Sequence, residues 1–178
     1  NYLEAKVNSR GNKNLNYLGS FFSETELAIL SNKTISIVGT NGKSSTANNI
    51  AMLLKGLDKS YIAFTSPHLF DHKERMTAHK DLNFDEYIQY LENFELKNNI
   101  NLGYFESVFL IAAKAFLHND LDYFICEAGI GGKYDTTSVI QSKTVVLTSI
   151  GLDHTDILGN KITAVSYTHL RAHETQQH

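Results

Sequence analysis

The stretch GTNGKSST, at positions 39–46, carries the clearest chemical pattern in the sequence. A strand that ends in a glycine-rich turn and then opens a helix directs backbone N–H groups and the positive helix end at one spot, which suits phosphate oxygens. Lys43 adds a mobile positive charge, and the hydroxyl residues Ser44 and Ser45 follow it. The general pattern G-x-x-x-x-G-K-[ST] needs a glycine where Ile37 stands, so only a shorter form is present. The stretch predicts a nucleotide phosphate loop; the alternative is a plain glycine turn with a solvated lysine.

Three further loops, each expected directly after a strand, carry side chains that could bind a metal ion. They are TSPHLFDHKERM with Ser66, CEAGIGGKYDTTSVI with Glu127, and TSIGLDHTDILG with Asp153, His154 and Asp156. Ligands collect at the carboxyl ends of parallel strands, so these loops should face the same crevice as the phosphate loop. Oxygen ligands such as the Glu127 carboxylate suit Mg²⁺, directly or through water. Each loop alone could be a polar surface turn, but their shared position favours one site.

The elements that must position these loops are indicated by hydrophobic patterning. Four continuous apolar runs predict strands, as expected for parallel strands covered on both faces: 34–38, 61–64, 122–126 and 144–150. Helices are expected at 45–57, 84–96 and 107–117, the last apolar almost all round and therefore buried. In the first helix, the expected buried stripe is Ile50, Leu53, Leu54 and Leu57. This alternation predicts an α/β fold with a mostly parallel sheet flanked by helices.

Length, charge and cysteine content exclude several classes of function. A length of 178 residues suits one domain or part of a larger one, and a net charge of -3 gives no basic footprint for nucleic acid or an anionic membrane. The single cysteine, Cys126, excludes an internal disulfide and a cysteine zinc cluster, which fits the cytoplasm. No apolar run is long enough to span a bilayer.

The sequence lacks an initiator methionine, so we expect it to begin inside a gene product. The histidine-rich stretch 164–178 is expected to be a non-native tail, which leaves 1–163 as one truncated domain.

Four motifs in this order carry a family resemblance: GTNGKSST, TSPHL with Glu74 and Arg75 beyond it, EAGIGGKYDTTSVI, and TSIGLDHTDILG. They resemble the folylpolyglutamate synthase and dihydrofolate synthase family, which belongs to the Mur ligase superfamily. The resemblance covers the chain from its first strand to about Thr163. It implies a P-loop-containing, Mur ligase-like ATPase domain, incomplete at its C-terminus, and a smaller glutamate-binding domain that lies beyond the sequence.

The resemblance also implies an activity. Members of the family are generally monomers that use ATP and Mg²⁺ to add L-glutamate to the carboxylate of dihydropteroate or of a reduced folate through an acyl phosphate. By motif match, the implied phosphate contacts are Thr40, Asn41, Gly42 and Lys43, the implied Mg²⁺ ligands are Ser66, Glu127 and His154, and the implied pterin contacts are Glu106, Ser107, Tyr134, Asp135 and Thr136. Lys43, Glu127 and His154 would carry the catalysis.

The chain departs from the family pattern in three places. Ser44 stands where the family usually has glycine, which is closer to the other Mur ligases, and Asp135 is followed by two threonines in place of threonine and asparagine. From Ala164 the sequence diverges before a lysine that the family typically carbamylates, so the 178 residues alone are predicted to be inactive. The open alternatives are another Mur-type ligase acting on a UDP-muramyl or similar acceptor, a P-loop NTPase that drives movement, and a nucleotide-binding domain without turnover. The sequence does not separate dihydrofolate synthase from folylpolyglutamate synthase.

Overall fold

The computed structural model describes residues 2–7, 15–68, 72–129 and 135–151. Its centre is one five-stranded sheet in the order β3-β2-β4-β1-β5. The strands β2, β4, β1 and β5 run parallel, and β3 pairs antiparallel with β2. The bounds are β1 Thr34–Val38, β2 Tyr61–Phe64, β3 Met76–Ala78, β4 Tyr123–Glu127 and β5 Thr144–Leu147. The expected α/β fold with a mostly parallel sheet is confirmed.

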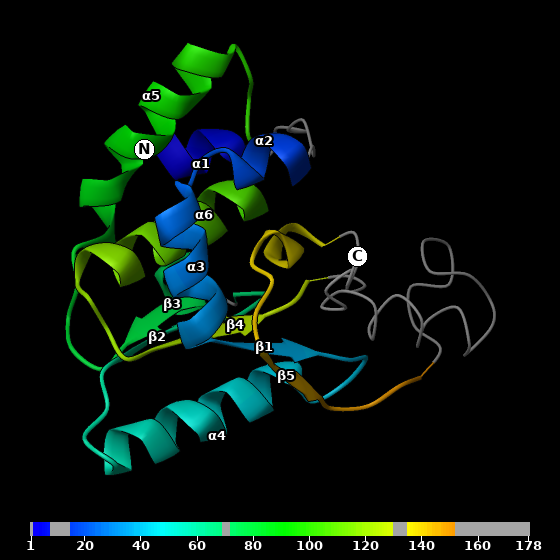
Figure 1. The fold of residues 1–178 in the computed structure, drawn as a ribbon. Helices are drawn as coiled ribbons and strands as arrows, with labels where there is room; N and C mark the ends of the chain where they lie inside the picture. The colour runs from blue at the N-terminus through cyan, green and yellow to red at the C-terminus, as the bar shows by residue number, and fades with distance from the viewer. Residues whose placement is uncertain (1, 8–14, 69–71, 130–134, 152–178) are drawn as a thin grey trace.

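Helices cover both faces of the sheet (Figure 1). The helix α4 lies on one face, and the other α-helices lie on the opposite face. The bounds are α1 Tyr2–Lys6, α2 Leu15–Gly19, α3 Glu24–Lys33, α4 Lys43–Gly56, α5 Ile88–Asn98 and α6 Tyr104–His118. Three short 3₁₀ helices are η1 His72–Arg75, η2 Phe84–Tyr87 and η3 Thr136–Val139. Among the helices that the structure describes, none combines the length and apolar character needed to cross a membrane.

The helix α6 organises the larger apolar core. As expected, it is buried almost all round, and the rings of Phe109 and Phe116 on it pack against Phe64 of β2 and Phe124 of β4. A second, smaller cluster lies between α4 and the sheet. Because both faces of the central strands are covered, their apolar runs are continuous instead of alternating.

The buried face of α4 differs from the expected stripe. Leu53 and Leu57 are both 68% exposed, whereas Ala47, Ala51 and Leu54 face the sheet. Of the expected stripe, Leu54 is therefore buried and Ile50 is only half-buried. Small alanine side chains let the helix approach the sheet closely, and this packing advantage is invisible to a pattern that counts large apolar residues.

Several predicted bounds also need correction. The third strand is shifted by one residue and includes Glu127, and the fourth ends at Leu147 because Thr148 and Ser149 turn toward the phosphate loop. The expected helix 84–96 begins with the 3₁₀ turn η2 and continues as α5 to Asn98. The expected helix 107–117 begins three residues earlier, at Tyr104.

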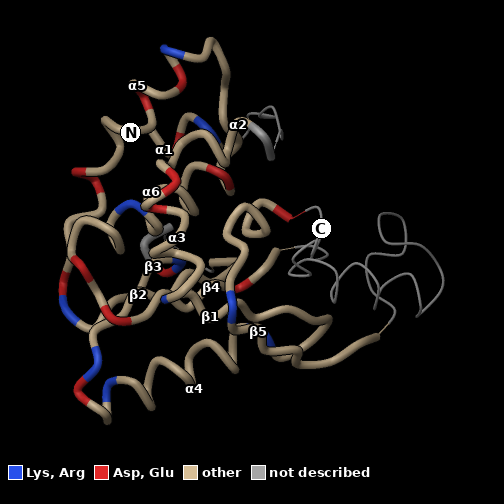
Figure 2. The backbone as a smooth tube through the Cα atoms, in the orientation of Figure 1, with Lys and Arg blue, Asp and Glu red and all other residues tan. Residues whose placement is uncertain are grey.

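Acidic and basic residues are both spread along the described backbone (Figure 2). The helix α5 carries Glu92 and Glu95, with Lys97 in its last turn. The expected tail, 164–178, lies outside the described residues.

Candidate functional site

The phosphate loop connects β1 to α4 and depends on two glycines. Gly39 has a φ of +136° and Gly42 has a φ of +83°. Residues other than glycine rarely adopt these backbone conformations. A Cβ on Gly39 would lie 2.3 Å from Thr148 Oγ1 and 2.8 Å from the Ser149 carbonyl oxygen. The loop therefore needs glycine at position 39 both for its backbone conformation and for its close approach to the segment after β5.

That segment holds the first half of the loop. The Thr40 N–H donates to the Ser149 carbonyl at 2.9 Å, and the Asn41 N–H donates to Ser149 Oγ at 2.9 Å. Thr40 Oγ1 accepts from the Gly151 N–H at 2.9 Å. The expected phosphate contacts Thr40 and Asn41 thus have their backbone N–H groups engaged by Ser149.

The second half of the loop is arranged differently. Gly42 is the N-cap of α4, and the first three N–H groups of the helix, those of Lys43, Ser44 and Ser45, precede the first intrahelical donor, Thr46. Lys43 Nζ donates to the carbonyls of Gly39 at 2.9 Å and Thr40 at 3.1 Å, so it spans the loop. A phosphate at this helix start would meet free N–H groups and a lysine that can exchange carbonyl oxygens for phosphate oxygens.

Glu127 lies at the carboxyl end of β4 and links two loops. Its side chain is almost fully buried, and its carboxylate accepts from Ser44 Oγ at 2.9 Å and from the Ser66 N–H at 3.1 Å. Burial raises the pKa of Glu127 above its ordinary value, while the two hydrogen bonds and the charges of Lys43 and Arg75 act in the opposite direction. Three of the expected site residues, Ser44, Ser66 and Glu127, are therefore brought together.

The oxygen-rich surroundings of Glu127 fit a hard divalent cation. Mg²⁺ prefers carboxylate and other oxygen ligands, and its charge would compensate a buried carboxylate. Within the described residues, no group of three or more His, Cys, Asp or Glu side chains forms a metal cluster. The expected third ligand, His154, lies outside those residues.

The expected pterin contacts fall into two environments. Thr136 Oγ1 donates to Glu106 Oε1 at 3.0 Å, so the start of α6 and the turn η3 meet there. Asp135 is buried and accepts from the Thr137 N–H at 3.0 Å as the N-cap of η3. The side chain of Ser107 is fully buried, and its hydroxyl donates to the Gly103 carbonyl at 2.9 Å. Tyr134 lies outside the described residues.

A cluster that residue spacing did not reveal lies next to Glu127. Arg75 Nε donates to His68 Nδ1 at 2.7 Å, and the Arg75 guanidinium carbon lies 5.3 Å from the centre of the Tyr104 ring. The sequence signal was the Glu-Arg pair after TSPHL, but nothing in it indicated Tyr104 at the start of α6. The charge of Arg75 counteracts the rise in the pKa of Glu127 that burial causes, so this cluster adds a second cation to the site beside Lys43.

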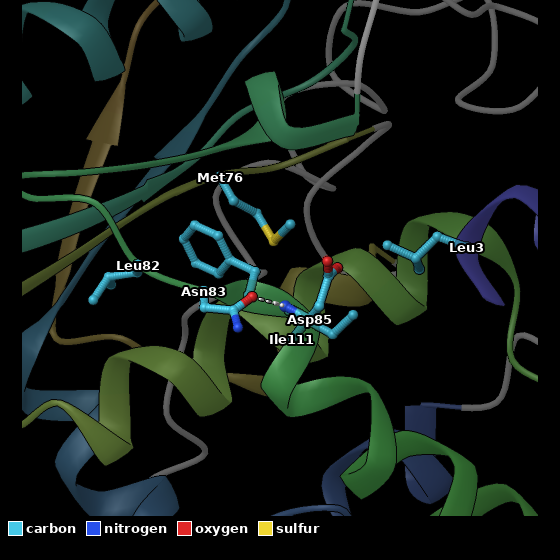
Figure 3. A pocket seen from close by; sticks show the side chains of 7 residues that line it. Leu3, Met76, Leu82, Asn83, Asp85 and Ile111 are labelled. Carbon is cyan, nitrogen blue, oxygen red and sulfur yellow. Dashed lines mark hydrogen bonds between the residues drawn. The ribbon is translucent and has the colours of Figure 1, made fainter. Parts of the chain in front are cut away.

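A separate small cavity lies between η2, β3, α1 and α6 (Figure 3). It is lined by Leu3, Met76, Leu82, Asn83, Phe84, Asp85 and Ile111. Its volume of about 60 Å³ is far below the roughly 300–1,000 Å³ of typical ligand pockets. The cavity is too small for a nucleotide or a pterin.

The curated proteins that this chain resembles include dihydrofolate synthase/folylpolyglutamate synthases from different bacteria. A dihydrofolate synthase/folylpolyglutamate synthase of Buchnera aphidicola is 38% identical over 144 residues, which are 78% of this chain and 34% of the relative. The enzyme of the same name from Escherichia coli K12 is 34% identical over 125 residues, 69% of this chain and 30% of the relative. The chain thus spans about a third of the length of these relatives. No protein-family model matches it.

Solved structures agree with these relatives. A complex of E. coli FolC with DHPP and ADP superposes with a TM-score of 0.81 at 28% identity, over 94% of this chain and 41% of that one. The apo form of L. casei FPGS gives a TM-score of 0.80 at 26% identity, over 96% of this chain and 44% of that one. The four-motif order, the fold and these relatives agree, and the chain belongs to the folylpolyglutamate synthase/dihydrofolate synthase family.

Proposed function

We propose that the full-length protein containing this chain is an ATP-dependent ligase. It adds L-glutamate to the carboxylate of dihydropteroate or of a reduced folate through an acyl phosphate. Residues 1–163 contribute the ATP-binding part of the enzyme, and the site residues have the roles that the motif match implies. The protein works as a monomer in the cytoplasm.

The observation that carries this proposal is the convergence of Ser44, Ser66 and Glu127 beside the phosphate loop. Two hydrogen bonds, from Ser44 Oγ at 2.9 Å and the Ser66 N–H at 3.1 Å, fix the carboxylate of Glu127 between the first turn of α4 and the loop after β2. A buried carboxylate held at the mouth of a phosphate loop is suited to a divalent cation that accompanies ATP. A glycine turn without function would have no need of this arrangement.

The protein's own groups have defined tasks in phosphoryl transfer. The N–H groups of Lys43, Ser44 and Ser45 bind phosphate oxygens, and the Lys43 ammonium moves from the loop carbonyls to the phosphates. These groups offset charge that builds up on the transferred phosphoryl group and are held in place before the reaction. Mg²⁺ bound at Glu127 and the Ser66 hydroxyl would supply Lewis-acid charge neutralisation.

The reaction proceeds in two steps. An oxygen of the acceptor carboxylate forms a bond to the γ-phosphorus as the bond to ADP breaks, and the product is an acyl phosphate. The amino group of glutamate then attacks the acyl carbon, inorganic phosphate leaves with the bonding electrons, and the amine loses its proton to give an amide. A carboxylate is a poor electrophile, so activation by phosphate explains why a ligase of this kind needs an ATP site.

Two of the complexes that superpose on this chain support the nature of the substrates. The superposing E. coli FolC was solved with DHPP and ADP, and an FPGS that superposes with a TM-score of 0.79 was solved with AMPPCP and folate. These ligands combine an adenine nucleotide with a folate-type molecule in proteins whose fold matches this chain.

The test is ADP release by the full-length protein with ATP, Mg²⁺ and glutamate. Dihydropteroate, a reduced folate and a UDP-muramyl peptide are compared as acceptors, and product formation is followed by mass spectrometry. We expect glutamate-dependent turnover with at least one pterin acceptor. The matched variant Lys43→Ala should be inactive. Turnover with only the muramyl acceptor, or none with any acceptor, would refute the proposal.

A further inference from the structure

Arg75, at the end of η1, is held in a fixed position beside the proposed site. Its Nε–H donates to His68 Nδ1 at 2.7 Å, and its guanidinium lies over the ring of Tyr104, 5.3 Å from the ring centre. The His68 ring also packs against Tyr104, with the two ring centres 5.8 Å apart. An imidazole that accepts at Nδ1 is neutral and carries its proton on Nε2. His68 and Tyr104 therefore orient the guanidinium without cancelling its charge.

The charge of Arg75 has no carboxylate partner in the described part of the chain. The ion pairs found there join Lys6 to Glu95, Lys33 to Asp120 and Lys114 to Glu26. Of the three guanidinium nitrogens of Arg75, only Nε has a hydrogen-bond partner among the described residues, so the two terminal nitrogens remain as donors. Arg75 is half-buried, and burial lowers its pKa, while Tyr104 and Glu127 act in the opposite direction. A partly desolvated cation with unused donors favours an anionic ligand.

Two cations lie beside the groups that hydrogen-bond to Glu127. Lys43 precedes Ser44, which donates to Glu127, and the Arg75 carbonyl accepts from the N–H of Thr65, which precedes the second donor, Ser66. Lys43 comes from the phosphate loop after β1, and Arg75 comes from the segment between β2 and β3. Burial raises the pKa of Glu127, and the charges of Lys43 and Arg75 counteract this rise. Lys43 belongs to the half of the site that binds ATP, which leaves Arg75 for a second anion on the other side.

We propose that the terminal nitrogens of Arg75 bind the reacting carboxylate of the acceptor. This inference rests on the proposed ligase function. It assigns to Arg75 the task of distinguishing an acceptor with a carboxylate from one with an uncharged carboxamide. The planar guanidinium matches the two oxygens of a carboxylate, and paired hydrogen bonds would aim one oxygen at the γ-phosphorus. When that oxygen bonds to phosphorus and ADP leaves, Arg75 keeps its contact with the acyl oxygen.

A cation is needed there because two anions must meet. The acceptor carboxylate approaches an ATP triphosphate beside the carboxylate of Glu127. Negative charges that come this close together in a partly buried site repel each other strongly. Of these two cations, Lys43 sits on the nucleotide side. Arg75 offsets the charge of the acceptor, and its fixed orientation avoids the cost of ordering a flexible side chain during binding.

The experiment measures how well the full-length protein distinguishes acid from amide. The acceptor that gives turnover, dihydropteroate or a reduced folate, is compared with the same molecule in which the reacting carboxylate is a carboxamide. Equilibrium binding of both is measured with AMPPCP and Mg²⁺ present. The wild-type protein should prefer the carboxylate by about 10- to 100-fold, the range of charge-assisted hydrogen bonds. Arg75→Gln should lose most of this preference, with AMPPCP affinity and carboxamide affinity unchanged.

Two further variants make the result decisive. Arg75→Lys keeps the charge but lacks the planar fork, so we expect an intermediate preference of about 10-fold or less; it decides the question if Arg75→Gln does not fold. Lys55→Gln, an exposed cation at the far end of α4, is the control and should keep the wild-type preference. If the wild type ligates but the Arg75 variants keep its full preference for the carboxylate, only the role of Arg75 is overturned. If the wild type ligates no pterin acceptor, the proposed function falls and this inference falls with it.

Discussion

The Ser44 hydroxyl donates to Glu127 Oε1 at 2.9 Å, joining the first turn of α4 to the carboxyl end of β4. Family members usually carry glycine at the position of Ser44, so this chain supplies a hydroxyl where the resemblance implies none. The bond places the hydroxyl oxygen next to the carboxylate that the motif match assigns to Mg²⁺. Position 44 therefore connects the nucleotide half of the site to the metal half.

Replacing Ser44 tests this connection. In Ser44→Ala, Glu127 loses one of its two described donors, and the hydroxyl is no longer available near a bound cation. Outer-shell partners of metal ligands are typically worth 10- to 100-fold in affinity, so we expect about a 10-fold higher Mg²⁺ concentration for half-maximal ADP release. A Mg²⁺ titration of the full-length protein checks this. Ser20→Ala, an exposed serine far from the loop, should give the wild-type curve; equal curves for both variants would contradict the role of Ser44.

Removing the charge of Glu127 should separate folding from activity. Glu127→Gln keeps the shape, and the Ser44 hydroxyl can rotate to accept from the new amide, so we expect stability to change by about 1 kcal/mol or less. Charge stabilisation by a metal is worth several kcal/mol, and its loss should lower kcat/KM by roughly 100-fold or more. Thermal unfolding and ADP release are measured on the same preparation. Near wild-type activity in this variant would remove Glu127 from the proposed site.

A methyl group on Gly39 should disrupt the loop. The Cβ of Gly39→Ala would lie 2.3 Å from Thr148 Oγ1 in a backbone conformation with φ of +136°, so either the loop or the segment after β5 must shift. We expect a loss of about 2–4 kcal/mol in the free energy of unfolding, measured in urea, together with weaker AMPPCP binding. The matched control is Gly56→Ala at the end of α4, where no atom lies within 4 Å of the new Cβ. This control should be neutral or slightly stabilising; equal losses in the two variants would contradict the strain at Gly39.

Local sequence patterns predict some of the helices and strands of this fold and miss others. The strand at 34–38 was predicted with its observed bounds because a continuous apolar run has few alternatives. The helix α3 was missed although Ser23 and Glu26 form a capping box, a signal that can be read from the sequence. The strand β3 was also missed, since three residues at a sheet edge carry little pattern.

In the candidate site, too, some residues were predicted from the sequence and some contacts were not. Ser44, Ser66 and Glu127 were expected at one sheet edge because parallel strands bring their carboxyl ends together. The bond between Asn41 and Ser149 joins residues 108 positions apart, and no local spacing indicates it. The same holds for Tyr104 beneath Arg75, because helix α6 approaches the loop only through the packing of the core.

The ion pair between Glu26 and Lys114 links α3 to α6 and predicts a pH dependence of stability. Burial alone would raise the pKa of Glu26, but the hydrogen bond from Lys114 and those from Ser23 outweigh it, and the pKa is lowered from 4.5. A lowered pKa means that the unfolded chain binds a proton more readily than the folded one. The stabilisation is therefore fully present above the ordinary value of 4.5 and is lost as the pH falls through the folded-state pKa below it.

Glu26→Gln measures this contribution. Glutamine can still accept from Ser23 at the start of α3, so the capping box is retained while the charge opposite the buried Lys114 is removed. We expect the variant to lose about 1–3 kcal/mol at neutral pH, and the gap to the wild type to close in acid, as urea unfolding at a series of pH values would measure. Glu24→Gln, an exposed carboxylate in the same helical turn, is the control and should shift stability by no more than about 0.5 kcal/mol. A gap for Glu26→Gln that stays constant into acid would show that the charge of Glu26 does not stabilise the fold, because protonation of the wild-type carboxyl should make the two proteins electrostatically equivalent.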